Sequence, residues 1–130
     1  MEDGTSESVT NTCGTGMSCE VRQILDRVGD KWSLLVMARL NGGTLRFTEL
    51  HRQIEGISQR MLTLTLRQLE RDGIVERTVH AVVPPRVDYN LSTLGKTLLD
   101  PIHALVQWTL DHADEVAAAR TAYDGRAAVT

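Results

Sequence analysis

Arginine and small polar residues recur at helical spacing between residues 58 and 71, and this is the clearest chemical pattern in the chain. At 3.6 residues per turn, Arg60, Thr63, Leu64 and Arg67 share one side of a helix, and Gln59 lies near its start. Guanidinium groups bind guanine edges and phosphates through paired N–H donors. The pattern therefore indicates a surface for nucleic acid, although spaced arginines also occur on ordinary solvated helices.

Four further residues are placed to contact DNA around this helix. Lys31, Arg46 and Thr48 stand at predicted helix starts or beside a turn, where they could hold phosphates. For Lys31, a plain surface lysine is an equally good interpretation. Arg86 follows Pro84-Pro85 at a predicted hairpin tip, from which its side chain could enter a narrow minor groove.

The spacing of apolar residues defines the elements that position these side chains. Helical spacing predicts a helix over residues 19–28, a second after Asp30, a third from Thr48 and a fourth from Ser58. Leu45 begins a short extended segment. Alternating apolar residues then predict two strands, 74–79 and 86–91, joined as a β-hairpin, and further helices follow over 92–119.

The order of these elements predicts a mainly α fold with a small β-hairpin. Only residues 55–57, centred on Gly56, separate the third and fourth helices, which is typical of a helix-turn-helix. The hairpin that follows makes the motif winged, so the fourth helix is expected to enter the major groove of double-stranded DNA. We expect a flexible acidic tail over 1–18, a winged helix-turn-helix domain with dimerisation helices over 19–120, and a frayed end over 121–130.

Composition limits the other classes of function. The net charge is −3, but the acidic excess lies at the two ends, and residues 57–91 carry five basic and four acidic side chains. We find no membrane-spanning run, signal peptide, nucleophile–base pair or phosphate loop, and we expect a cytoplasmic protein that is not an enzyme and needs no cofactor. Cys13 and Cys19 should then be free thiols, and the scattered histidines predict no metal site.

Several motifs together resemble the HxlR-type winged helix-turn-helix regulators, relatives of the MarR group. They lie in family order at Cys19 and at residues 29–35, 45–50, 56–63, 69–73, 83–89 and 91–95. The resemblance implies a dimeric DNA-binding regulator, often a repressor. It also implies that Cys19 occupies the position at which some members sense oxidants or quinones. Leu64 departs from the polar residue usual in this family, so it either meets a thymine methyl group or packs inward.

The apolar residues outside the helix-turn-helix indicate a dimer surface. One winged domain reads only a half-site, so two copies are needed for specificity. The candidate surface consists of Val21, Leu25, Val28, Ile102, Leu105, Val106, Trp108 and Leu110. Packing within one chain is the alternative interpretation of these residues.

Two hypotheses for the whole chain follow. The first is a regulator, expected to be a repressor, that binds a pseudo-palindromic operator as a homodimer. It responds either to a redox signal at Cys19, with Cys13 as the resolving thiol, or to a small-molecule effector. The second is a winged-helix module for protein–protein interaction, in which the arginine-bearing side contacts no phosphate.

Overall fold

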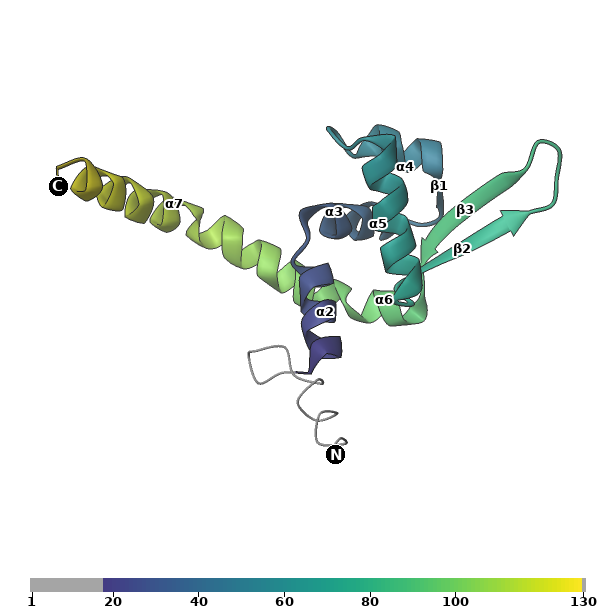
Figure 1. Cartoon of the computed structure of the whole chain (residues 1–130), viewed down its shortest axis with the longest axis horizontal. Helices are drawn as coiled ribbons and strands as arrows, with labels where there is room; N and C mark the ends of the chain where they lie inside the picture. Colours follow the sequence, from purple (N-terminus) through teal and green to yellow (C-terminus); the bar gives the residue numbers. More distant parts are fainter. Residues whose placement is uncertain (1–17, 130) are drawn as a thin grey trace, which may run out of the picture. The chain divides into compact units, whose positions relative to one another are not determined.

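The computed structural model describes the backbone of residues 18–129 and the side chains up to residue 126 (Figure 1). It divides into two compact units, Met1–Thr97 and Leu98–Thr130. The first unit contains α2 (Cys19–Val28), α3 (Lys31–Leu40), β1 (Leu45–Arg46), α4 (Phe47–Gln53), α5 (Gln59–Arg71), β2 (Val75–His80), β3 (Arg86–Leu91) and α6 (Thr93–Thr97). The second contains α7 (Leu99–Val129). The winged helix-turn-helix fold predicted from sequence is confirmed.

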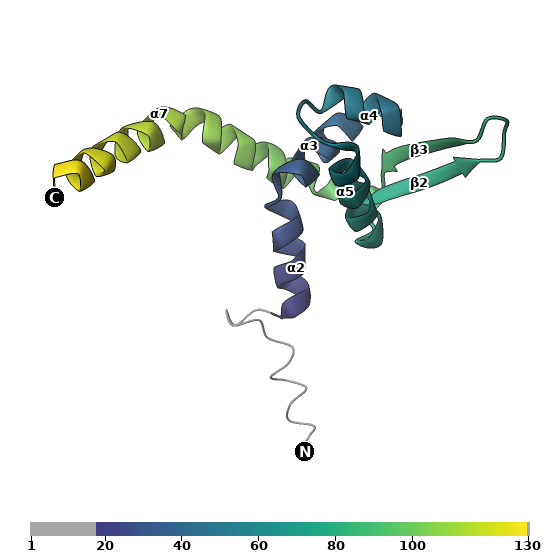
Figure 2. The ribbon, with the colours of Figure 1, turned by 45° about the horizontal axis from the view of Figure 1, so that its top comes forward.

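Helices α3, α4 and α5 pack together and enclose the core of the first unit (Figure 2). Its buried apolar residues come mainly from these helices and from the base of the sheet, and include Val36, Met37, Leu40, Leu50, Ile54, Ile57, Leu62, Leu66, Leu69, Ile74, Val75 and Leu91. Gly56 joins α4 to α5 with φ +87°, in the left-handed region that side chains with a Cβ rarely adopt. The tight turn of the motif therefore depends on glycine.

The wing is the hairpin of β2 and β3, and it belongs to a three-stranded antiparallel sheet with the order β1-β3-β2. Val75 pairs with Leu91 at the base of the hairpin, and His80 pairs with Arg86 at its far end. Leu45 pairs with Tyr89, so the short segment before α4 is a strand. This pairing attaches the start of α4 to the wing.

Ser92 ties the base of the wing to α6. Its Oγ donates a hydrogen bond to the carbonyl oxygen of Gly73 at 2.6 Å and accepts one from the N–H of Gly95 at 2.9 Å. Gly95 is buried, and a Cβ at this position would clash with the main-chain carbonyl group of Ile74. The close approach of α6 to the sheet therefore requires glycine at residue 95.

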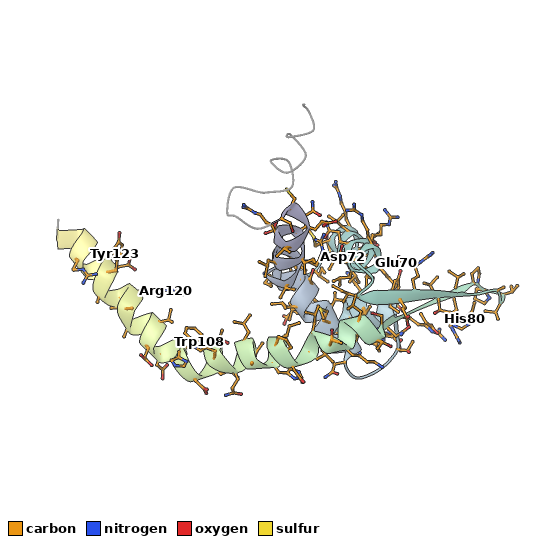
Figure 3. The ribbon with its side chains drawn as sticks, turned by 90° about the horizontal axis from the view of Figure 1, so that it is seen from below. Glu70, Asp72, His80, Trp108, Arg120 and Tyr123 are labelled. Atoms are coloured by element: carbon orange, nitrogen blue, oxygen red, sulfur yellow. The ribbon has the colours of Figure 1, made fainter. Side chains whose placement is uncertain are left out.

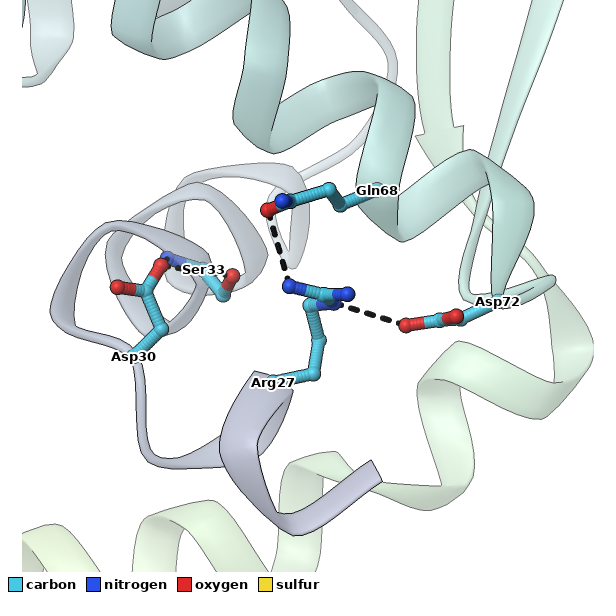
Figure 4. Close-up of polar contacts among 5 residues, drawn as sticks. All are labelled: Arg27, Asp30, Ser33, Gln68 and Asp72. Carbon is cyan, nitrogen blue, oxygen red and sulfur yellow. Dashed lines mark hydrogen bonds and ion pairs between the residues drawn. The ribbon is translucent and has the colours of Figure 1, made fainter. Parts of the chain in front are cut away.

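Arg27 links α2 to the C-terminal end of α5 (Figure 4). Its guanidinium donates to Asp72 Oδ2 and to Gln68 Oε1, each at 2.9 Å. Nearby, Asp30 caps α3 by accepting hydrogen bonds from the N–H and the hydroxyl of Ser33, both at 3.0 Å. The Arg27 contacts hold α2 against the helix that carries the candidate site, and the Asp30 contacts fix the start of α3.

The second unit consists of α7, a helix of 31 residues. The frayed end expected over 121–130 is corrected, because α7 continues to Val129. Residues 116–124 contain several alanines and no proline, so the high helix propensity of this stretch accounts for the longer helix. Along α7, Trp108 stacks on His112 with ring centroids 4.6 Å apart, and Figure 3 labels Trp108, Arg120 and Tyr123. The tail expected over 1–18 lies, apart from Ser18, outside the described residues.

A search of the described helices finds none with both the length and the apolar character required to cross a membrane.

Candidate nucleic-acid interface

Helix α5 has one side buried in the core and the other exposed. Ser58 begins the helix as predicted, and its Oγ accepts a hydrogen bond from the N–H of Met61 at 3.0 Å. Leu62 and Leu69 are fully buried, while Arg60 and Arg67 are exposed. The core thus fixes the rotation of the helix about its axis and leaves the arginine-bearing side open to solvent.

The exposed side of α5 forms a shallow hollow together with the start of α4. The hollow has a volume of about 490 Å³ and is lined by Phe47, Gln59, Arg60, Thr63, Leu64 and Arg67. Five of these six residues are candidates from the sequence, and the structure brings all five together. None of the six is acidic, so the hollow offers donors and apolar groups without a carboxylate that would repel phosphate. We refer to it as the α5 hollow.

Phe47 is the member of the α5 hollow that sequence reasoning missed. It is half-buried, and its ring stacks on His51 with centroids 6.4 Å apart and an interplanar angle of 5°. The signal in the sequence was a rare aromatic residue directly before Thr48, in a chain with only five aromatic side chains. Its place against α5 depends on the turn between α4 and α5, which sequence spacing does not specify.

Arg60 and Arg67 have no ion-pair or hydrogen-bond partner among the described residues. The ion pairs found there join Arg27 to Asp72 and Asp88 to both His80 and Arg86. An exposed, unpaired guanidinium retains all of its N–H donors for a ligand. Both side chains are therefore available to base edges or phosphates.

A second hollow lies between α4 and the wing, and it contains three more of the predicted DNA-contacting residues. It measures about 400 Å³, and its lining includes Arg46, Thr48 and Arg86. Arg46, rather than the predicted Thr48, is the N-cap of α4, and its N–H donates to Glu49 Oε1 at 2.8 Å. The pairing of β1 with β3 ends at Arg46, and α4 begins at the next residue, Phe47. Thr48 is therefore the second residue of the helix and not its cap.

Arg86 lies directly after the hairpin tip, at the start of the predicted strand 86–91. It begins β3 opposite His80, and its Nε lies 3.4 Å from Asp88 Oδ1, while His80 Nε2 lies 2.8 Å from Asp88 Oδ2. Figure 3 labels His80 on the wing. The tip itself is residues 81–85, where Val83 is 99% exposed. Asp88 therefore holds the Arg86 side chain beside the sheet, where it shares a hollow with Arg46 and Thr48.

Comparison with known proteins assigns this geometry to a family. Residues 27–117 match the model of the family described as HxlR-like helix-turn-helix. The chain belongs to this family. An HTH-type transcriptional regulator of Methanothermobacter thermautotrophicus is 46% identical over 90 residues, which are 69% of each chain. The HTH-type transcriptional regulator YtfH of Escherichia coli is 40% identical over 110 residues, or 85% of each chain.

A solved structure agrees with this assignment. The redox regulator HypR in its reduced form superimposes with a TM-score of 0.70 at 39% identity, over 76% of this chain and 98% of that one. The resemblance found in the sequence is confirmed, and this HxlR-like protein is a transcriptional regulator of the helix-turn-helix type. Its relatives carry the names of regulators rather than of enzymes.

Lys31 of this HxlR-like regulator lies apart from the other predicted DNA-contacting residues. It is the first residue of α3, and its Nζ lies over the Trp32 ring, 4.4 Å from the centroid. Neither of the two hollows described above includes it in its lining. A phosphate contact at Lys31 remains a prediction.

Cys19 is the first residue of α2, and it is disulfide-bonded in the structure. This corrects the expectation of free thiols. That expectation depended only on the redox state expected of the compartment. Cys13 lies outside the described residues.

The candidate dimer surface of this HxlR-like regulator is exposed at all but two of its positions. Val21, Leu25, Leu105, Val106 and Trp108 are all between 44% and 53% exposed, and Val28 is half-buried. Ile102 is only 6% exposed, which corrects its place in the set because a buried side chain offers no area to a partner. Leu110, which belongs to the same predicted surface, is 68% exposed, and Tyr123 of α7 is an exposed apolar residue that the prediction did not include.

Proposed function

We propose that this regulator binds a pseudo-palindromic operator in double-stranded DNA as a homodimer and acts as a repressor. The observation that carries the proposal is the α5 hollow, in which two unpaired arginines flank the exposed side of the second helix of a helix-turn-helix. A helix of this kind fits the major groove, and its side chains then reach base edges.

The second hollow supports the same orientation on DNA. Arg46 and Thr48 lie at the start of α4, and Arg86 lies beside them on the wing. With α5 in the major groove, α4 crosses the backbone and these residues meet phosphates, which fix the register of the protein without reading sequence. We assign Arg86 to a phosphate rather than to the minor groove because its guanidinium is drawn toward Asp88.

The homodimer follows from the amount of apolar surface that a single chain leaves exposed. Both α2 and α7 carry exposed leucine, valine or tryptophan side chains, and burial of such residues drives association. Two copies present two α5 helices, which is the requirement for reading two half-sites about one helical turn apart. A dimer bound over a promoter would exclude the transcription machinery.

Selection of bound sequences from random duplexes, with the full chain, tests this function. We expect a recovered site with two inverted half-sites, and an affinity that falls steeply between 50 and 200 mM salt because bound phosphates release counterions. Absence of any shifted duplex at low salt, together with a stable complex with a different protein, would favour the interaction-module hypothesis instead.

The dimer surface gives a separate prediction. Leu105→Glu places a charge on the exposed apolar side of α7 and should convert the dimer to a monomer, with at least about a tenfold loss of affinity for the two-half-site operator. Gln107→Lys places a charge on the other side of the helix, where it can pair with Asp111 in place of the hydrogen bond from Gln107, and it serves as the control. Sedimentation and anisotropy titration measure the two effects. A dimeric Leu105→Glu protein would show that the interface lies elsewhere.

We further propose that the redox state of Cys19 regulates DNA binding. The support is the disulfide at the first residue of α2, a helix that carries part of the proposed dimer surface, and the similarity to a protein described as a redox regulator. Hydrogen peroxide would take two electrons and two protons from the thiols of Cys19 and Cys13, forming one disulfide and two molecules of water. The bond would then alter the start of α2.

Substitution of Cys19 tests the redox proposal. Operator affinity of the wild-type protein should change at least about fivefold between peroxide and dithiothreitol, a typical size for coupling between two sites. Cys19→Ser should bind with one affinity under both conditions, and thiol titration should show that the wild type loses two thiols on oxidation. If Cys19→Ser responds as the wild type does, the signal is sensed elsewhere, as a small-molecule effector would require.

A further inference from the structure

We propose that Leu64 reads the 5-methyl group of a thymine in the major groove, so that each half-site requires a thymine at one position. This inference rests on the proposed function and specifies the DNA that the α5 hollow recognises.

Leu64 does not belong to the core. It is 47% exposed, although it lies on a helix whose buried side is already filled by Leu62, Leu66 and Leu69. The sequence left open whether Leu64 packs inward or meets DNA, and the structure places it in the lining of the α5 hollow. Exposure to water does not stabilise a large apolar side chain, whereas contact with an apolar group of a ligand lowers the free energy by removing apolar surface from water.

The neighbours of Leu64 make this part of the hollow apolar. Phe47 contributes an aromatic ring to the same lining. The hydroxyl of Thr63 donates to the carbonyl oxygen of Gln59 at 2.9 Å, so its proton is engaged within the helix. The charged donors are on Arg60 and Arg67, one turn before and one turn after Leu64, and Gln59 adds a side-chain amide at the start of the helix.

Thymine is the base that matches this arrangement. In the major groove its C5-methyl group is an apolar feature of a base edge, whereas cytosine, adenine and guanine present amino groups, N7 or O6. Any of these polar atoms against Leu64 would lose its hydrogen bonds to water without a replacement. Thymine is therefore the base whose major-groove edge suits Leu64, with Arg60 and Arg67 one turn away on either side.

Replacement of single thymines by deoxyuridine tests the assignment, because uracil keeps the hydrogen-bonding edge of thymine and lacks only the methyl group. The full chain is titrated by fluorescence anisotropy against the selected operator and against duplexes carrying one deoxyuridine each. For the wild-type protein we expect about a fourfold loss of affinity at one position in each half-site, the effect of removing one buried methyl group. Leu64→Ala should bind thymine and deoxyuridine duplexes equally at that position.

Thr63→Ser is the matched control, since it removes a neighbouring methyl group and keeps the hydroxyl bond to Gln59; it should retain the fourfold loss. Equal affinity of the wild type for every deoxyuridine duplex would overturn the inference and leave the proposed function intact. A loss that persists in Leu64→Ala, or disappears in Thr63→Ser instead, would overturn the assignment to Leu64. Failure of the wild type to bind any duplex would overturn the proposed function, and this inference with it.

Discussion

Replacing both Arg60 and Arg67 by alanine is expected to lower operator affinity by at least about thirtyfold. Each guanidinium is exposed and free of internal partners among the described residues, so each can form a bidentate contact with a guanine or bind a phosphate. Such a contact discriminates between bases by about 1–3 kcal/mol, so two of them together amount to about 2–6 kcal/mol, which is about thirtyfold or more in affinity. Anisotropy titration of each variant against the selected operator measures the loss.

Two further variants separate base contacts from phosphate contacts. Arg60→Lys keeps the charge and removes the planar fork, so it should retain affinity for non-specific DNA while losing discrimination at one base pair. Arg39→Ala removes an exposed arginine at the end of α3, outside the α5 hollow, and should leave affinity unchanged within a factor of about two. Undiminished operator binding by the double alanine variant would refute the role of the α5 hollow.

Gly95→Ala is expected to destabilise the winged unit severely, by about 3 kcal/mol or more. The added Cβ would clash with the main-chain carbonyl of Ile74, and backbone cannot move aside as the end of a flexible side chain can. The shift needed to relieve the clash would also strain the hydrogen bond from the N–H of Gly95 to Ser92 Oγ. Urea denaturation followed by circular dichroism measures the change in unfolding free energy.

The same substitution at Gly125 is the matched control and should have the opposite sign. Gly125 lies within α7, and a Cβ there meets nothing within 4 Å. Alanine favours a helix interior over glycine by about 1 kcal/mol, so Gly125→Ala should increase the helicity or the stability of α7. If Gly95→Ala unfolds at the same urea concentration as the wild type, the predicted clash between residue 95 and the carbonyl group of Ile74 does not occur.

The amino-acid sequence by itself determined the type and order of the elements and the side of α5 that is exposed. These are local properties: the apolar spacing of Leu62, Leu66 and Leu69 fixes which side is buried, and Ser58 fixes where the helix begins. Arg60 and Arg67 then fall on the opposite side by helical geometry alone. The family motifs lie in the same local segments, which explains why the resemblance could be seen without coordinates.

Only the tertiary structure decided which distant residues meet. Phe47 joins the α5 hollow because the Gly56 turn folds α4 against α5, and Arg86 approaches Asp88 because the register of the hairpin places it at the start of β3. The sequence also left open whether Leu64 packs inward, and its place in the lining of the α5 hollow was decided by the packing of the unit. Which side of a helix or strand a residue occupies follows from the regular repeat of that element. Which residues of different elements meet depends on the turns between the elements and on how they pack in the whole unit.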